Sequence, residues 1–177
     1  LYVRTGEDQG AIGENFLVAR VRRRALQQSY FGAIYTVRDA PSDEAAAQHT
    51  VGADFRLATS TFRKNKNLFF TGYVVANSTA GDAGGSQAAF GTMLDYPNDV
   101  VDMSMSFQQV GESYNPAVGF TPRREFRRYT PEARWNPRPS GNRFIRRFGF
   151  GAQPNVFTNL QGDLETVDGN IQAFRME

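Results

Sequence analysis

The stretch Val101-Asp-Met-Ser-Met-Ser-Phe-Gln108 alternates apolar and polar side chains at every position. Successive side chains of a β-strand point to opposite sides of the sheet, so this run gives a strand one apolar and one polar face. The same alternation occurs in residues 50–57 and 87–96, whereas the alanine-rich Ser42–Gln48 is the only patch of helix-like composition. The pattern therefore predicts an all-β protein built from amphipathic antiparallel strands.

Nine strands are expected from this alternation, each of ten or more residues. They lie at 14–24, 29–38, 49–62, 68–78, 86–96, 100–110, 125–136, 143–157 and 164–176. Strands of soluble proteins most often have about five or six residues, whereas a membrane-crossing strand needs about 9–11. Strand length therefore favours a membrane-spanning barrel. Pro131 removes a backbone donor from its strand, so a bulge or kink is expected there.

The connections between the expected strands differ in length. Residues 25–28, 97–99 and 161–163 are short links and 63–67 is intermediate, whereas 39–48, 79–85 and 111–124 are longer and polar or rich in glycine and proline. Short turns at one end and long loops at the other are typical of outer-membrane barrels. The short link 97–99 also predicts that the runs at 49–57, 86–96 and 100–110 are neighbouring or near-neighbouring strands of one sheet.

The composition fits amphipathic sheets with one solvent-exposed polar face better than a protein with a single hydrophobic core. Aromatic residues make up 13% of the chain, including 15 Phe, yet the mean hydropathy is −0.49. The formal net charge is +2, and every basic residue except Lys64 and Lys66 is an arginine. Arginine suits charges that pair with carboxylates in a confined place, although a biased genome would give the same excess. The chain has no cysteine and no apolar run of about 18 residues, so disulfides and membrane-spanning helices are not expected.

Charged residues at alternate strand positions are the candidate functional residues. Arginine that faces lipid at mid-bilayer costs about 2–4 kcal/mol, so in a barrel these side chains are expected to line a hydrated interior. The candidates are Arg20, Arg22, Asp54, Arg56, Asp102, Arg128, Glu132 and Arg134, with Arg24 and Asp95 at equivalent positions. Such a wall would attract an anion or bind a plug. Alternatively, its arginines pair with Asp54, Asp95, Asp102 and Glu132 and form a solvated inner wall.

Other chemistries have little support in the sequence. Arginines and aromatic residues interleave in Tyr114–Tyr129, as they do on surfaces that bind single-stranded nucleic acids, but the nearly neutral charge argues against a nucleic-acid partner. His49 is the single histidine, which excludes a multi-histidine metal site, and its place in a polar segment predicts a solvated loop residue. Gly81–Gly85 precede no expected helix, as a phosphate-binding loop would require. No catalytic residue, metal or cofactor is therefore predicted, and an enzyme is not expected.

Four large aromatic residues lie near the ends of the expected strands: Tyr30, Tyr96, Tyr129 and Trp135. Membrane barrels carry aromatic girdles at the level of the lipid headgroups. Ordinary packing of aromatic side chains on sheets would give the same placement.

Several short strings resemble one bacterial protein family. They are Glu14-Asn-Phe-Leu-Val-Ala-Arg-Val21, Gly32-Ala-Ile-Tyr-Thr36, Gly52-Ala-Asp-Phe-Arg56, Tyr114-Asn-Pro-Ala-Val-Gly-Phe120, Arg124-Glu-Phe-Arg-Arg128 and Trp135-Asn-Pro-Arg-Pro139. The family is an uncharacterised outer-membrane β-barrel domain that follows a family 9 carbohydrate-binding-like domain. The resemblance covers roughly residues 13–177 and implies a Gram-negative outer membrane, a link to carbohydrate and a chain that is part of a longer polypeptide. No family motif is catalytic.

The favoured hypothesis is a single segment, residues 1–177, of an outer-membrane β-barrel that serves in binding, transport or surface anchoring. Its expected partners are outer-membrane lipid, the remaining strands of the same polypeptide and a carbohydrate. Bacterial single-chain barrels have an even number of strands, so nine would not close into a barrel. The sequence begins at Leu1 without a signal-peptide pattern, which predicts a mature form or a piece of something longer. The alternative is a soluble periplasmic ligand-binding module, in which the apolar row of Met103 and Phe107 would meet a second sheet.

Overall fold

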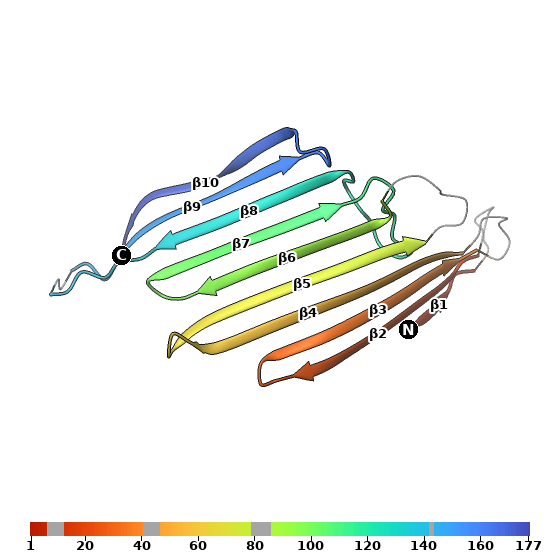
Figure 1. Ribbon diagram of the computed structural model, residues 1–177, viewed down its shortest axis with the longest axis horizontal. Coiled ribbons are helices and arrows are strands. Elements are labelled where there is room, and N and C mark those ends of the chain that lie inside the picture. The colour runs from red at the N-terminus through yellow and green to blue at the C-terminus, as the bar shows by residue number, and fades with distance from the viewer. Residues whose placement is uncertain (7–12, 41–46, 79–85, 142–143) are drawn as a thin grey trace. The chain divides into compact units, whose positions relative to one another are not determined.

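A computed structural model describes residues 1–6, 13–40, 47–78, 86–141 and 144–177 as an all-β protein (Figure 1). Its strands are β1 (Tyr2–Arg4), β2 (Asn15–Ala25), β3 (Ser29–Asp39), β4 (Gln48–Phe62), β5 (Lys66–Ser78), β6 (Ala88–Pro97), β7 (Val101–Val110), β8 (Phe126–Trp135), β9 (Phe148–Thr158) and β10 (Leu164–Met176). They form one sheet in the order β1-β2-β3-β4-β5-β6-β7-β8-β9-β10, so each strand pairs with its neighbours in sequence. Among the described residues no helix is long and apolar enough to cross a membrane.

All nine expected strands are confirmed, with ends that shift by a few residues. The count of nine is wrong because the structure adds β1, which pairs antiparallel with β2 through Tyr2↔Leu17 and Arg4↔Asn15. A strand of three residues is too short to show an alternating pattern. The sheet is nevertheless open in this order, with β1 and β10 at its two ends. Most of the helix-like patch Ser42–Gln48 lies outside the described residues, and its last residue begins β4.

The expected neighbours also occur. β6 and β7 are adjacent, and β4 is separated from β6 only by β5. The N-terminal hairpin is regular, because the β2–β3 register runs without a shift from Asn15↔Asp39 to Ala25↔Ser29. This register fixes which side chains of the two strands share a face.

The expected alternation of short and long connections holds for all but the last two. In an antiparallel meander, successive connections lie at alternate ends of the strands. The short link after β9 therefore lies at the same end as the long connections that follow β3, β5 and β7, while the longer connection after β8 lies at the end of the short turns. Assigning residues 161–163 to the short-turn end was wrong, because length alone does not show at which end a link lies.

Pro131 does not produce the expected bulge on the β9 side of β8. The pairs Arg127↔Thr158 and Ala133↔Ala152 keep the same register across the proline. Counting from either pair places Pro131 opposite Pro154, so both missing backbone donors fall on one rung of the ladder. The register shifts instead lie between β9 and β10, after Leu164 and after Gln172.

The sheet divides into two compact units whose boundary crosses β4 to β8. Unit 1 comprises Leu1–Phe55, Gly72–Phe90 and Gln109–Phe126, and unit 2 comprises Arg56–Thr71, Gly91–Gln108 and Arg127–Glu177. The buried hydrophobic residues Ala89, Val110, Ala117 and Phe126 all belong to unit 1. Within the described part of unit 2, no hydrophobic side chain is buried. Hydrogen-bonded pairing between strands, rather than a dry core, is therefore the main source of order in unit 2.

The turn between β4 and β5 gives the first testable prediction. Arg63 and Lys64 both have positive φ angles, 47° and 84°, which side chains other than Gly and Asn adopt at a cost of about 1 kcal/mol each. We expect the double substitution Arg63→Asn/Lys64→Gly to raise the free energy of unfolding by about 1 kcal/mol. Urea titration, followed by the fluorescence of the single tryptophan, measures this change. Asn65→Gly is the matched control, because Asn65 lies in the same turn without a positive φ, and an equal gain from this control would contradict the prediction.

Candidate functional site

A chain of charged side chains crosses one face of unit 2. Arg134 of β8 forms ion pairs with Glu132, its neighbour on the same face, and with Asp102 of β7 at 3.6 Å. The Glu132 side chain retains only 16% of its exposure and that of Asp102 30%. Arg134 therefore neutralises two partly buried carboxylates at once.

A second polar network continues along β8, β9 and β10 on this face. Glu132 accepts a hydrogen bond from the Gln153 amide at 3.0 Å. Asn155 accepts hydrogen bonds from Arg128 at 2.9 Å and Thr130 at 3.0 Å, and its own amide donates to Asp168 at 2.9 Å. The network joins three strands through uncharged amides that lie between the charged groups.

Asp95 and Arg56 extend the same face toward β6 and β4. Asp95 is close enough to Asp102, Glu132 and Arg56 for their charges to act on its carboxyl group. The Arg56 guanidinium lies over the Phe69 ring, 4.5 Å from its centroid. Six of the predicted interior charges are thus gathered on one face of unit 2: Arg56, Asp95, Asp102, Arg128, Glu132 and Arg134.

The predicted charges of unit 1 form a separate group. Arg20 of β2 pairs with Asp54 of β4 at 2.7 Å, across the intervening strand β3. Gly32 makes this crossing possible, because a Cβ atom there would lie 2.6 Å from Asp54 Oδ1. Arg22, on the same face as Arg20, stacks over the Tyr30 ring at 3.5 Å.

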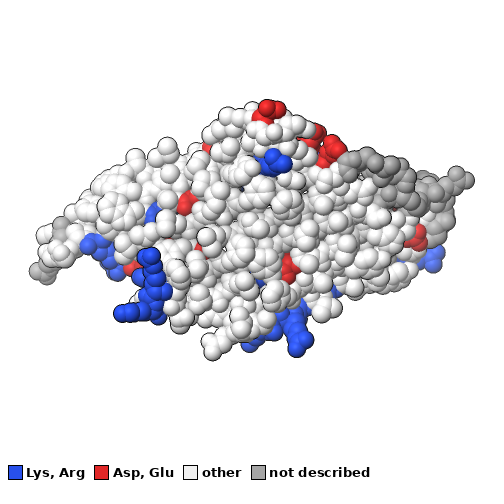
Figure 2. Space-filling model, viewed as in Figure 1, with Lys and Arg blue, Asp and Glu red and all other residues white. Residues whose placement is uncertain are grey.

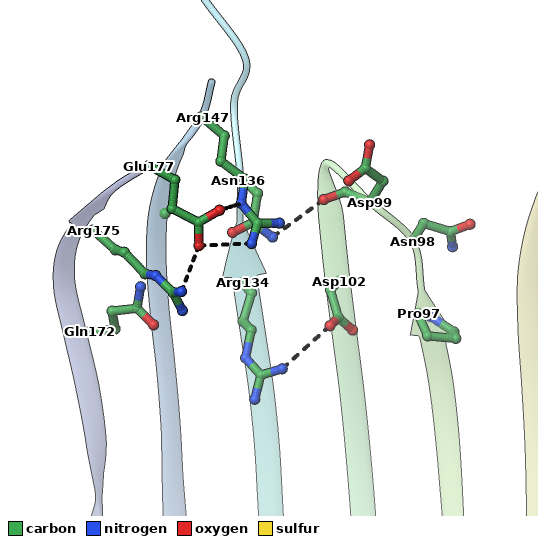
Figure 3. A pocket seen from close by; sticks show the side chains of 11 residues that line it. Pro97, Asn98, Asp99, Asp102, Arg134, Asn136, Arg147, Gln172, Arg175 and Glu177 are labelled. Carbon is green, nitrogen blue, oxygen red and sulfur yellow. Dashed lines mark hydrogen bonds and ion pairs between the residues drawn. The ribbon is translucent and has the colours of Figure 1, made fainter. Parts of the chain in front are cut away.

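A polar cavity of about 580 Å³ opens at one end of the charged face of unit 2 (Figure 3). Its lining residues are Pro97, Asn98, Asp99, Asp102, Arg134, Asn136, Arg147, Gly149, Gln172, Arg175 and Glu177. A Cβ atom at the lining residue Gly149 would lie 3.1 Å from the Gln172 amide nitrogen, so the Gln172 side chain packs closely against this glycine. In Figure 3 the side chains of Arg147, Arg175 and Glu177 turn toward one another.

The charges in the cavity are compensated. Glu177 binds Arg147 at 2.7 Å and Arg175 at 2.6 Å, and Arg138 binds Asp99 at 2.8 Å beside the cavity. The hydrogen bond from Arg147 holds the pKa of Glu177 below its ordinary value, so this contact is lost only as the pH falls through that lowered pKa. Because each arginine is paired with a carboxylate, the cavity has little excess positive charge. It therefore suits water and small polar solutes better than a highly charged anion.

The opposite face of the sheet is apolar. In unit 2 it carries Met103, Met105 and Phe107 of β7, and Phe107 contacts Tyr129 with ring centroids 5.1 Å apart. An aromatic cluster lies where β8 and β10 end and β9 begins. In this cluster Trp135 stacks on Phe150 at 5.6 Å, and Phe174 contacts both Phe148 and Phe150. In the view of Figure 2, uncharged residues cover most of the surface, and charged side chains are visible only at a few separate places.

The expected placement of the four large aromatic residues near strand ends is met only in part. Trp135 and Tyr96 lie at the ends of their strands, but Tyr129 is the fourth residue of β8. Tyr30 lies near a strand end but on the charged face, where it supports Arg22. His49 lies in β4 rather than in a loop, and its ring stacks on Tyr35, whose hydroxyl is 2.8 Å from His49 Nδ1.

The sequence analysis found the charges of this face but missed its amides. Gln153, Asn155 and Gln172 were not selected, although the alternation of residues 148–156 contains the signal that places Gln153 and Asn155 opposite Phe150. The pairing of Arg20 with Asp54 and of Arg134 with Asp102 and Glu132 agrees with the interpretation of a solvated wall of compensated charges. Within the described residues, no group of three or more His, Cys, Asp or Glu side chains is arranged to hold a metal ion.

Comparisons with known proteins identify no relative of this chain. No family model matches the chain, and no curated protein or solved structure matches it. The resemblance to the outer-membrane barrel domain therefore stays a prediction.

The double pairing of Arg134 gives a second testable prediction. Arg134→Met should lower the free energy of unfolding by about 1–3 kcal/mol, because it leaves the carboxylates of Glu132 and Asp102 without their cation. Arg138→Met is the matched control. It breaks a pair whose side chains are more than half exposed, so its cost should stay below about 1 kcal/mol. Equal urea-unfolding midpoints for the two variants would show that Arg134 holds no special place in the network.

Proposed function

We propose that this chain is a segment of an outer-membrane β-barrel whose apolar face contacts lipid and whose charged face lines a hydrated interior. The observation that supports this proposal most is that carboxylates of the charged face are partly buried while large apolar side chains of the opposite face are exposed. The side chains of Glu132 and Asp54 retain 16% and 19% of their exposure, whereas Met105 and Val51 retain 44% and 59%. Soluble proteins seldom leave an extended apolar surface uncovered.

The lengths of the strands support the same proposal. Strands β2 to β10 have between 10 and 15 residues, and a tilted strand needs about 9–11 residues to cross the hydrocarbon core. Every pairing in the sheet joins strands adjacent in sequence, as in an up-and-down barrel. The soluble periplasmic module has no comparable support, because the described residues contain no second sheet to cover Met103 and Phe107.

The role we propose for this barrel is the binding or passage of small polar solutes, with carbohydrate as the class that the family resemblance implies. Compensated charges and amides along β7 to β10 offer hydrogen bonds to hydroxyl groups without a large excess of either charge. Surface anchoring is the other role that the same architecture could serve. An alkaline wash of a membrane fraction separates an inserted barrel, which stays in the pellet, from a soluble module, which is released.

Two adjacent residues of β7 provide a sharp test of which face meets lipid. Met105→Arg should lower the free energy of unfolding from lipid vesicles by about 2–4 kcal/mol, because it places a charge on the lipid side near the middle of the strand. Ser104→Arg introduces the same side chain on the charged face and should cost less than about 1 kcal/mol. Urea titration in vesicles measures both values. A soluble sheet left uncovered as in this structure, where Met105 retains 44% of its exposure, would instead tolerate Met105→Arg, since that side chain would already lie in water.

A further inference from the structure

The connection between β7 and β8 returns onto the charged face of unit 1. We define the cover segment as residues 111–125. Its backbone donates two hydrogen bonds to side chains of the sheet: Ala117 N to Thr50 Oγ1 at 2.8 Å, and Asn115 N to Asn77 Oδ1 at 2.9 Å. These contacts join positions 67 and 38 residues apart in sequence, so the segment crosses over strands rather than extending away from them.

Thr50 and Asn77 both belong to the charged face. Thr50 lies on the same face of β4 as Gly52 and Asp54, because the three positions are two residues apart. Asp54 binds Arg20 on that face. A Cβ atom at Gly52 would lie 2.6 Å from Val75 Cγ1, which places Val75, and with it Asn77 two residues further along β5, on the same side. The cover segment therefore lies on the face that we propose is hydrated.

The contact between the cover segment and the sheet excludes solvent. Thr50 and Asn77 each retain 6% of their exposure and Ala117 retains 4%. Tyr114 is half-buried beside Tyr73, and this burial raises the pKa of its hydroxyl. These residues are among the most buried of the described part of the chain, although none lies in a conventional apolar core.

Both ends of the cover segment are fixed by tight backbone geometry. Gly111 donates to Ala88 O at 2.9 Å, and a Cβ atom at Gly111 would lie 2.1 Å from Ser86 O, so only glycine fits. At the other end Glu125 has a φ of 58°, which turns the chain sharply into β8. The path of the segment is thus set at its two ends, while its middle is held by side-chain acceptors.

The middle of the cover segment is attached to the sheet by polar groups. Thr50 and Asn77 contribute a hydroxyl and an amide, and among the described residues the buried Asn77 Nδ2 has no hydrogen-bond partner. Water can replace each of these hydrogen bonds at a net cost that is small compared with the loss of an apolar contact. Release of the segment would also hydrate the unpaired amide, so the closed state is only modestly favoured.

From this geometry we infer that the cover segment occludes the charged face of β4 and β5, and that polar solutes reach this part of the face only when the segment is released. The inference rests on the proposed function for its consequence, the control of solute passage. The seating of the segment itself can be tested independently of membrane insertion.

The seating test uses the absence of cysteine from the chain. A reporter Ala117→Cys places its thiol at a position that retains 4% of its exposure, and Ala117 contacts Thr50 only through its backbone N–H. The matched reporter Val118→Cys lies next to it at a position that retains 39%. We expect a charged thiol reagent to modify position 117 at least about tenfold more slowly than position 118. Thr50→Val, which removes the acceptor for Ala117 N without changing side-chain shape, should speed modification at position 117 about fivefold, the factor for one hydrogen bond. Thr50→Ser keeps the acceptor and should leave the rate unchanged.

Equal rates at positions 117 and 118 would overturn the inference, as would a Thr50→Val rate that matches Thr50→Ser. Far-UV circular dichroism of each variant shows whether the sheet is intact. If Thr50→Val has the same spectrum as Thr50→Ser but its reporter thiol is modified faster, the segment has been released without a general loss of structure.

The passage test locks the segment in place. The double variant Thr50→Cys/Ala117→Cys, joined by a short bifunctional thiol reagent, should reduce the uptake of a neutral sugar into vesicles that carry the protein, and cleavage of the cross-link should restore it. Uptake that is unaffected by the cross-link would contradict control by this segment. If the protein is instead released from membranes by an alkaline wash, the proposed function fails, while the labelling rates still decide the seating of the segment.

Discussion

A single sheet with two unlike faces is the constraint on which the rest of this structure depends. Each strand pairs with its neighbours in sequence, and the described residues contain no second sheet that could cover either face. Backbone pairing can hold such a sheet together, but it does not decide what surrounds the side chains. Both faces must therefore meet an environment that suits them, one that accepts rows of Met, Val and Phe and one that hydrates arginine and carboxylate.

The charged face meets this constraint by local neutralisation. Arg134 serves two carboxylates, Arg20 reaches across β3 to Asp54, and the amides of Gln153 and Asn155 fill positions between charges. Glycine has a specific part in this arrangement, since the missing side chain of Gly32 lets residues of the two flanking strands meet. The face is thus polar along its length without the excess of positive charge that binding of nucleic acid would require.

The return of the β7–β8 connection gives unit 1 a buried layer of a different kind. Thr50, Asn77 and Ala117 are buried by a segment of the same chain that uses the hydrogen-bonding groups of the charged face. In unit 2 the equivalent face stays open and ends in the cavity bordered by Arg147, Arg175 and Glu177. One sheet therefore carries both an occluded and an accessible stretch of charged surface.

The sequence by itself determined the strands and their two faces, because apolar and polar residues alternate with a period of two in runs such as Val101–Gln108. It also identified the charges of the polar face, since apolar and polar positions alternate along each strand. It did not show β1, which is too short for a period, nor the end at which each connection lies. The tertiary structure alone decided which carboxylate each arginine meets and where residues 111–125 lie. These contacts join strands and segments tens of residues apart, and their register depends on the pairing of the whole sheet rather than on any local pattern.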